Sequence, residues 1–461
     1  MNLPPSPVRP AAKGAAIQWT TGTLTYTTAG LAALFCWLLW GDFAWSMRDR
    51  SVPAIIQILF KRFEASDTLV GILTGSLPPI LSMVVGPVIS YKSDRHRGRW
   101  GRRIPFLLIP TPLIVASMIG VCFSSQLGAL LRQVLGEHAL SINVSVLLFL
   151  GLFWTLFEFG CITANSVFGA LVNDVVPKPV LGRFFALFRA LSLIAGIVFN
   201  YWMIAKAEVH YIVFFLCIAA LYGVGFTLMC LNVKEGEYPP PLEPAPDAPN
   251  GFFAAASDYF RNCFGKPYYL WFFAMMASAA LANGPVNVFA LFYAQSVAMS
   301  MAAYGKCLAL TYVISLVLAY PLGALADRFH PLRLSLVLLG LYIGVGVWGG
   351  LYARNSTNFS IAFVAHGVLT GAYLTASASM GQKLLPSARF AELMSASGIV
   401  TCLCSAAIAP CMGVVLDRTG HSYHYTFYAG GVLALAAVAL NWVMYVKFAA
   451  LGGVKEYAAP E

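Results

Sequence analysis

The stretches SDRHRGRWGRRIPF (Ser93 to Phe106) and GALADRFHPLRL (Gly323 to Leu334) decide the fold, because together they indicate a duplicated chain. Each is a basic loop after a long apolar run, and each places the pair Asp-Arg where that run ends. A second pair of loops agrees: LVNDVVPKPVLGRFF begins at Leu171, QKLLPSARFAELM begins at Gln382, and both have a proline before Arg-Phe. Matching loops in the two halves predict two structural repeats.

Hydrocarbon must be the solvent for most of this chain. Hydrophobic residues occupy 59% of the 461 positions and charged residues only 10%, whereas about a quarter of the residues of a soluble domain are charged. A transmembrane helix needs about 20 apolar residues to cross roughly 30 Å of hydrocarbon. Two sets of six such runs occur, at about 24–47, 68–90, 104–124, 145–171, 184–204 and 211–232, and at about 268–295, 304–325, 333–353, 360–380, 393–415 and 426–446. The sequence therefore predicts an all-α membrane protein with twelve transmembrane helices in two pseudo-symmetric six-helix bundles.

The polar stretches between and beside these runs divide the chain. The central one contains KEGEYPPPLEPAPDAPN, which is rich in proline and has no apolar period, as in a flexible linker. The segment from Gly251 to Phe264 has the composition of a short interfacial helix. The predicted units are a flexible cytoplasmic N-tail over 1–22, a bundle over 23–232, a cytoplasmic linker over 233–267, a bundle over 268–448 and a C-tail over 449–461.

The distribution of positive charge predicts the orientation in the membrane. With both termini in the cytoplasm, 20 of the 29 lysines and arginines fall on the cytoplasmic side, as the positive-inside rule requires. The net charge of +10 lies in these loops, which argues against a nucleic-acid partner. We expect no signal peptide, because no short apolar core with a cleavage site follows the first twenty residues. We therefore expect a multi-pass protein of the inner (plasma) membrane that contacts lipid and works as a monomer on a small-molecule substrate.

The repeated Asp-Arg loops are a candidate gate on the cytoplasmic face. An aspartate at a helix end can pair with arginine across a tight loop and cap neighbouring helix termini. Such contacts would hold the face shut and break when it opens. The alternative is a plain cytoplasmic anchor that obeys the charge rule. The predicted gate residues are Asp94, Arg95, Arg102, Arg103, Asp327 and Arg328.

Charged residues inside the apolar runs are candidates for a transport pathway. A charge at mid-bilayer costs at least about 2.5–3.5 kcal/mol, so it usually has a function. Asp42 and Glu158 are such residues, although a structural hydrogen bond between helices would also explain Glu158. The segment from Arg48 to Arg50 leaves two alternatives. If the first helix ends at Met47, these charges lie in an outer loop. If it continues to Phe60, they lie in a central cavity, where two arginines can bind hydroxyls or a carboxylate.

Three stretches resemble known families of the major facilitator superfamily. SDRHRGRWGRRIPF is similar to the second cytoplasmic loop of the glycoside–pentoside–hexuronide:cation symporters and the related sucrose carriers. WGDFAWS, from Trp40, resembles the Gly-x-Asp-Phe stretch of melibiose-type permeases, and VLDRTGHSYHYTF, from Val415, resembles a common facilitator ending of the eleventh span. The resemblance implies cation-coupled movement of a sugar or glycoside by alternating access.

The same resemblance implies which residues bind the sugar. Asp42 matches an acid on the first helix, whereas Asn165 stands where these carriers have an acid on the fourth. Glu158 lies seven residues earlier on the same helical face. The first helix of the family continues well past the match, which favours the cavity alternative for the segment from Arg48 to Arg50. The implied substrate-binding residues are Asp42, Arg48, Asp49, Arg50, Glu158, Asn165 and Arg183.

One departure from the family concerns the coupling ion. The acids of its sodium site match Ser82 and Gly86 here, and the second run contains no acid. Proton coupling through Asp42 and Glu158 is therefore expected instead, with no metal and no other cofactor. Arg183 resembles an arginine that contacts sugar in the family, and the alternative for this residue is a cytoplasmic anchor.

Three other functions compete with sugar transport. Arg48 and Arg50 would suit another small solute, such as a sugar acid, a muropeptide or a peptide. A pigment-carrying or assembly factor of the same fold would be insensitive to loss of Asp42. An enzyme is not expected, since the chain has no His-Glu helix motif, nucleophile elbow or cluster of histidine ligands.

Overall fold

The structure is a computed structural model that describes residues 18–136, 140–238, 252–386 and 389–460. Within these residues, twelve helices are long and apolar enough to cross a membrane. The elements of the first half are β1 Trp19–Thr21, β2 Leu24–Tyr26, α1 Thr28–Arg62, α2 Asp67–Val70, η1 Gly71–Ser76, α3 Leu77–Arg95, α4 Ile104–Leu108, α5 Pro110–Cys122, α6 Ser124–Leu135, α7 Ile142–Val175, α8 Lys178–Val198, η3 Phe199–Met203, α9 Ile204–Val209 and α10 Tyr211–Asn232. Those of the second half are α11 Phe252–Phe264, α12 Pro267–Ser296, α13 Met301–Phe329, α14 Pro331–Tyr352, α15 Ser356–Ser377, α16 Met380–Leu384, α17 Phe390–Arg418, α18 Tyr425–Ala450 and α19 Gly453–Glu456. The predicted all-α fold of twelve spans is confirmed.

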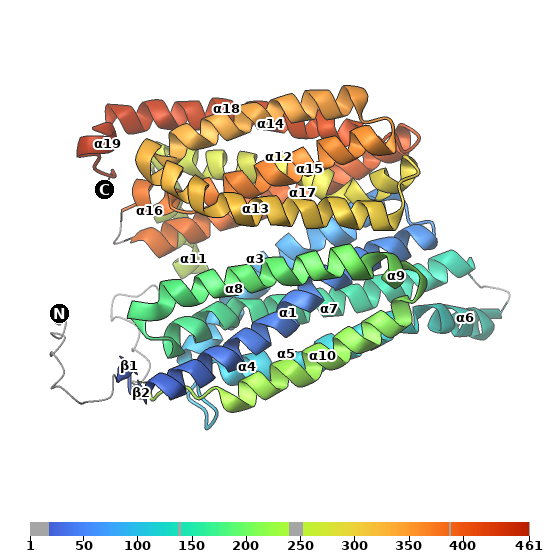
Figure 1. The fold of residues 1–461 in the computed structure, drawn as a ribbon, viewed down its shortest axis with the longest axis horizontal. Coiled ribbons are helices and arrows are strands. Elements are labelled where there is room, and N and C mark those ends of the chain that lie inside the picture. The colour runs from blue at the N-terminus through green and yellow to red at the C-terminus, as the bar shows by residue number, and fades with distance from the viewer. Residues whose placement is uncertain (1–17, 137–139, 239–251, 387–388, 461) are drawn as a thin grey trace.

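The helices form two bundles that lie side by side (Figure 1). The first contains α1 to α10, in which α1 packs on α8 and α10, and α5 packs on α7 and α10. The second contains α12 to α18, in which α12 packs on α17 and α18, and α14 packs on α15 and α18. Both ends of the described chain lie at one end of the bundles, which we call the terminal face; the opposite end is the distal face (Figure 1).

Helix α1 is much longer than the apolar run that predicts it. Thr27 caps its first turn by accepting a hydrogen bond from the Gly30 amide, and the helix continues for 35 residues to Arg62, about 50 Å at 1.5 Å per residue. Hydropathy falls at Arg48 because three charges follow one another, but the helix continues past Pro53, which itself has no amide hydrogen to donate. The first helix thus continues past Phe60, as the second alternative requires, but of these charges Arg50 alone lines the cavity between the bundles, and Arg48 and Asp49 line a smaller cavity within the first bundle.

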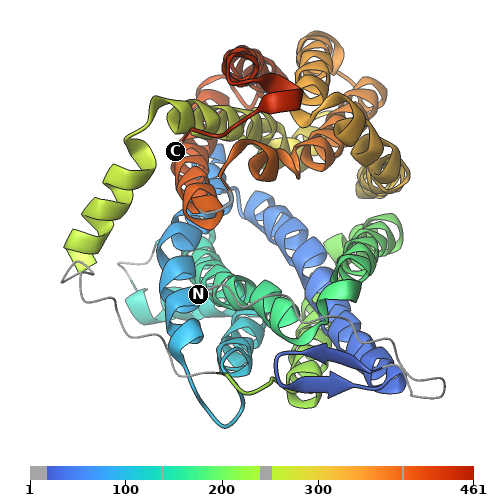
Figure 2. The same ribbon diagram turned by 90° about the vertical axis from the view of Figure 1, so that its left-hand side faces the viewer.

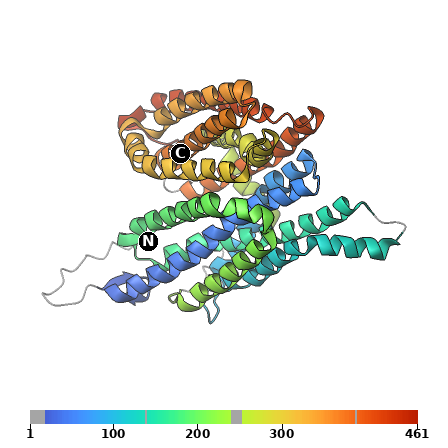
Figure 3. The same cartoon turned by 45° about the vertical axis from the view of Figure 1, so that its right-hand side comes forward.

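Parts of the predicted tail and connections are regular. Residues from Trp19 to Tyr26 form an antiparallel hairpin beside the terminal face (Figure 2), so the N-tail expected to be flexible over 1–22 contains a strand, which its alternating aromatic and threonine residues favour. The rest of that tail, 1–17, and the linker core, 239–251, lie outside the described residues. The expected short helix after the linker is α11. On the distal side, α6 and the start of α7 form a hairpin that extends past the other helices (Figure 3).

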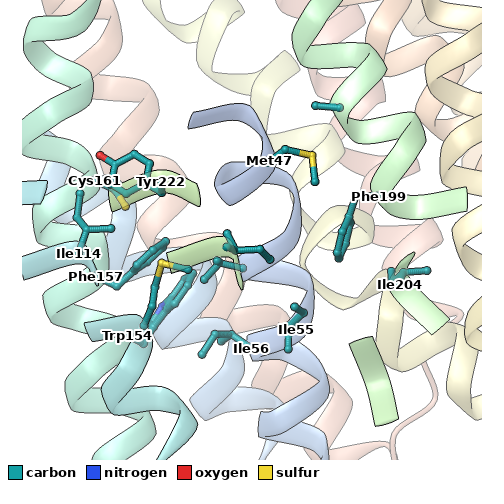
Figure 4. Packing of buried hydrophobic residues seen from close by; sticks show 14 of the residues in the cluster. Met47, Ile55, Ile56, Ile114, Trp154, Phe157, Cys161, Phe199, Ile204 and Tyr222 are labelled. Carbon is teal, nitrogen blue, oxygen red and sulfur yellow. The ribbon is translucent and has the colours of Figure 1, made fainter. Parts of the chain in front are cut away.

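The core of the first bundle surrounds the charged part of α1. Met47, Ile55 and Ile56 of α1 are buried in one cluster with Trp154 and Phe157 of α7, and Met47 lies on the side of Phe199 (Figure 4). Of the charges that follow Met47, Arg48 is therefore held among well-packed side chains, whereas Asp49 is exposed.

The two bundles meet near the distal face. There α2 and η1 pack on α17, while η3 and α9 pack on α13. Glycines allow this approach: a Cβ added to Gly71 would lie 2.6 Å from the carbonyl oxygen of Ala409, and one added to Gly413 would lie 2.5 Å from that of Asp67. These seams place a cavity between the bundles on their terminal side.

Candidate functional site

A central cavity of about 530 Å³ lies between the two bundles. The first bundle contributes two cations, Arg50 of α1 and Arg189 of α8. The second contributes neutral polar groups and rings from α12, α13 and α15. Its lining residues are Arg50, Phe188, Arg189, Ser192, Leu193, Asn287, Leu308, Thr311, Tyr312, Ser315, Phe363, His366, Gly367, Thr370, Gly371 and Leu374. Among the described lining residues none is acidic, so the cavity favours a hydroxyl-rich or anionic solute over a cation.

Arg50 connects the two bundles across this cavity. Its Nη2 donates to the Ser192 hydroxyl at 3.3 Å within the first bundle, and its Nη1 donates to the Tyr312 hydroxyl of the second at 3.5 Å. The guanidinium carbon lies 5.2 Å from the centre of the Tyr312 ring. The buried Nε has no hydrogen-bond partner among the described residues. Both bonds to Arg50 are long, so this arginine retains donor capacity for a solute.

The wall from the second bundle is a network of neutral groups. His366 pairs with the side-chain oxygen Oδ1 of Asn287 through Nε2 at 2.9 Å and with the Tyr342 hydroxyl through Nδ1 at 2.7 Å. Thr370 donates to the Asn283 side chain at 2.8 Å. These bonds tie α12, α14 and α15 together, and they orient amides and hydroxyls beside the cavity, as a site for a polar neutral group requires.

A second cavity, of about 220 Å³, lies inside the first bundle between α1 and α7. It brings together four of the seven residues that the resemblance predicts for substrate binding: Arg48, Asp49, Glu158 and Asn165. The long α1 helix makes this possible, because it carries its charges to the level of Glu158 on α7.

Arg48 is the most unusual member of this group. Its side chain is 1% exposed, and its guanidinium carbon lies 4.0 Å from the centre of the Trp45 ring and 5.0 Å from that of Tyr222. Its one described ion pair, with Asp49, is 3.8 Å long. Nε and Nη1 have no hydrogen-bond partner among the described residues. A buried cation with unused donors costs free energy, and a polar solute in the cavity would supply the missing acceptors.

Two of the predicted binding residues line neither of these cavities. Asp42 is completely buried in α1, where Oδ1 accepts a 3.5 Å bond from Ser46 and Oδ2 has no described partner. Arg183 is exposed near the start of α8, at the terminal face. Arg189 lines the central cavity but is absent from the predicted set. The signal that identifies Asp42, a charge within an apolar run, applies equally to Arg189.

The predicted gate residues pair within each bundle at the terminal face. In the first, Arg103 pairs with Asp94 at 2.5 Å, and Asp174 at the end of α7 binds both Arg102 and Arg103, at 2.8 and 3.0 Å. In the second, Asp327 pairs with Lys383 at 3.1 Å. The partners Asp174 and Lys383 were not predicted, although both lie in the second pair of repeated loops.

The two other gate residues contact aromatic rings of their own helices. Arg95 stacks on Tyr91 with its guanidinium carbon 3.7 Å from the ring centre, and Arg328 lies 5.4 Å from that of Phe329. No ion pair joins described residues of the two bundles at this face. A latch between the bundles at the terminal face therefore stays a prediction.

Comparison with known proteins agrees with this architecture. A family model described as MFS/sugar transport protein matches residues 61–414. No curated protein matches the chain in sequence. Among solved structures, a bacterial homolog to the human lysosomal transporter Spinster, inward-facing and unoccupied, is similar at 15% identity and a TM-score of 0.66, covering 94% of this chain and 98% of that one.

Two further structures share the fold. A D-xylose-proton symporter has 14% identity and a TM-score of 0.61, over 89% of this chain and 96% of that one. A nucleoside transporter has 10% identity and a TM-score of 0.63, over 90% of this chain and 100% of that one. At these identities the likeness establishes the fold alone.

Proposed function

Because the chain belongs to the MFS/sugar transport protein family, we propose that it moves a sugar or glycoside across the membrane by alternating access, coupled to protons. The observation that carries the proposal is the central cavity between the bundles, where Arg50 faces the amides and hydroxyls of the second bundle. Alternating access requires a site reached from either side as the bundles rock about it. A transporter, rather than an enzyme, is what such an arrangement supports.

The chemistry of the lining supports a sugar. Sugar hydroxyls both donate and accept hydrogen bonds, and the cavity offers donors on Arg50 and Arg189 with amide and hydroxyl groups opposite. Phe188, Tyr312 and Phe363 add apolar ring faces. Donors, acceptors and ring faces arranged around one cavity can bind a single sugar through several weak contacts.

Proton coupling is proposed through Asp42 and Glu158. Asp42 is buried with one carboxylate oxygen unpaired among the described residues, and Glu158 lines the inner cavity with Arg48. A carboxylate that takes up a proton loses its charge and can move through the low-dielectric phase. Binding and release of that proton would shift the balance between the two open states, since only differential affinity can do so.

The setting in the cell forms part of the same proposal. The terminal face would be cytoplasmic, since it carries the basic loops around Arg102 and Arg103. The membrane would be the inner (plasma) membrane, and a single chain would be the working unit, in contact with lipid.

An anionic solute, such as a sugar acid, is the second candidate substrate. One specific observation favours it: Arg50 and Arg189 both face the central cavity, while no described lining residue carries a negative charge. A planar guanidinium matches a carboxylate through two parallel bonds.

The test is proton movement in membrane vesicles or proteoliposomes on addition of single solutes. Neutral disaccharides and glycosides form one arm, and the corresponding uronic acids form the other, with Asp42→Asn as the coupling control. Alkalinisation by a neutral glycoside that Asp42→Asn abolishes supports the first candidate. A response to uronic acids alone selects the second. If no solute moves protons and none is transported, both candidate substrates are excluded, and a non-transporting role is the remaining explanation.

A further inference from the structure

At the distal face, an aspartate of each bundle accepts hydrogen bonds from residues of the other bundle. Asp67 and Thr68 open α2 in the first bundle, and Asp417 lies in the last turn of α17 in the second. The loop after α17 adds His421 and Tyr423. Each bundle thus offers one aspartate to donors that belong to the other.

Asp417 caps a helix of the opposite bundle. Its Oδ1 accepts from the Asp67 amide at 2.9 Å, and its Oδ2 accepts from the Thr68 amide at 3.0 Å and from the Thr68 hydroxyl. The helix it caps continues from Asp67 through η1 and α3 to Arg95 as one membrane span. A negative charge at a helix N-terminus satisfies unpaired amides and opposes the helix dipole. Separating the bundles would leave these amides without that carboxylate.

Asp67, in the first bundle, bonds in turn to residues of the second bundle. Its Oδ2 pairs with His421 Nδ1 at 2.6 Å, and its Oδ1 accepts from the Tyr423 hydroxyl at 2.9 Å, while its side chain is only 3% exposed. Burial and the nearby Asp67 carboxylate raise the pKa of Tyr423, so this phenol keeps its proton and donates. Ligand atoms of Asp67, Asp417 and His421 lie within 4.8 Å of one another, but all four carboxylate oxygens already accept hydrogen bonds, so the cluster is complete without an ion.

The second contact between the bundles, where η3 and α9 pack on α13, differs from the first. Ser300 caps α13 and Gly305 follows five residues later, just as Ser66 caps α2 and Gly71 follows. Gly305 packs against the backbone of Asn200 in η3. No carboxylate of a described residue crosses that seam. Both seams therefore share close glycine packing, and among the described residues a carboxylate bonds across the seam of α2 with α17 alone.

We propose that Asp67 and Asp417 form a reciprocal latch, completed by Thr68, His421 and Tyr423, which holds the distal face closed. The free energy needed to break the hydrogen bonds of this latch determines how readily the distal face opens. The latch is separate from the Asp-Arg loops, which pair within their own bundles at the terminal face. It also does not depend on which solute the protein carries.

Hydrogen–deuterium exchange of the purified full chain in nanodiscs tests the latch without a substrate. Asp417→Asn removes the charge and one acceptor at constant shape, and Arg418→Gln, at the exposed neighbour, is the matched control. We expect amides of 66–76 and 405–418 to exchange about tenfold faster or more in Asp417→Asn, as loss of a charged hydrogen bond predicts. Exchange in 301–309, at the other seam, should rise as well, because opening the face separates both seams.

Two results would overturn the proposal. Native exchange rates at 66–76 in folded Asp417→Asn would show that the carboxylate does not hold the bundles together. A rise confined to 66–70 would show a local helix cap that has no influence on opening. If Asp417→Asn does not assemble, Thr68→Val and Tyr423→Phe each remove one donor, and each must raise exchange at both seams by a few fold for the latch to stand.

Discussion

The two walls of the central cavity differ in the charge of their side chains. The first bundle contributes Arg50 and Arg189 and, elsewhere on α1, two buried charged residues, Asp42 and Arg48. The second contributes amides, hydroxyls and a histidine held in a neutral network. The two bundles carry matching loops, yet among the described residues only the first bundle places charged side chains along these two cavities. We propose from this difference that the first bundle binds charge and protons and that the second recognises the polar groups of the solute.

The largest effect is expected at Arg50, which joins the two walls. Arg50→Ala should lower the initial rate of solute uptake by about tenfold to a hundredfold, since it removes charged hydrogen bonds within the cavity. Uptake into proteoliposomes measures this change. Arg132→Ala, at an exposed position on α6, is the control and should behave like the native protein. Equal rates for both variants would place the solute elsewhere.

Loss of the acids should separate coupling from binding. Asp42→Asn and Glu158→Gln fix each side chain in an uncharged form, so we expect at least about tenfold less proton-driven accumulation. Solute counterflow, which needs no net proton movement, should remain. Counterflow and accumulation measured on the same vesicles provide the comparison, and a variant that loses both to the same degree would contradict the coupling role.

Substitutions in the neutral wall should be milder. Thr370→Val removes one hydroxyl from the network with Asn283, and loss of a single neutral hydrogen bond corresponds to a change of about two- to tenfold in the half-saturating concentration. The maximal rate should change little. A larger loss than that of Arg50→Ala would reverse the proposed division between the walls.

The smallest effect concerns His330, at the terminal face of the second bundle. Burial, with Lys383 and Arg333 nearby, lowers the pKa of His330 to about 4. The unfolded chain binds the proton first, so His330 makes the fold less stable as the pH falls from about 6.5 to 4. In a thermal scan, His330→Gln should lose fewer degrees of melting temperature over that interval than the native protein. An identical loss would mean that His330 does not contribute.

The sequence predicts the spans well because each bilayer crossing needs its own apolar run. It predicts their ends poorly where a helix carries charge: hydropathy ends the first run before Arg48, whereas α1 continues to Arg62. The resemblance to sugar carriers predicts Arg48, Asp49, Glu158 and Asn165, and these residues share a cavity. Whether they bind a solute stays a prediction.

The contacts between the bundles could not be predicted from the sequence. Asp417 lies in a stretch noted only as a facilitator-like helix ending, and Asp67 stands at the start of a span, where an acid is unremarkable. Their pairing depends on the packing of α2 on α17, which glycines make possible but do not specify. Arg189 differs, because its position within an apolar run was visible from the sequence.

The central claim is that a solute crosses the membrane through the cavity that Arg50 lines. Counterflow of a labelled glycoside, and separately of a labelled uronic acid, in proteoliposomes with native protein and Arg50→Ala tests it most directly. Saturable counterflow of one of them that Arg50→Ala reduces by about tenfold or more is the predicted result. Counterflow that is unchanged in Arg50→Ala, or absent with every solute although the native protein is folded, would contradict the account.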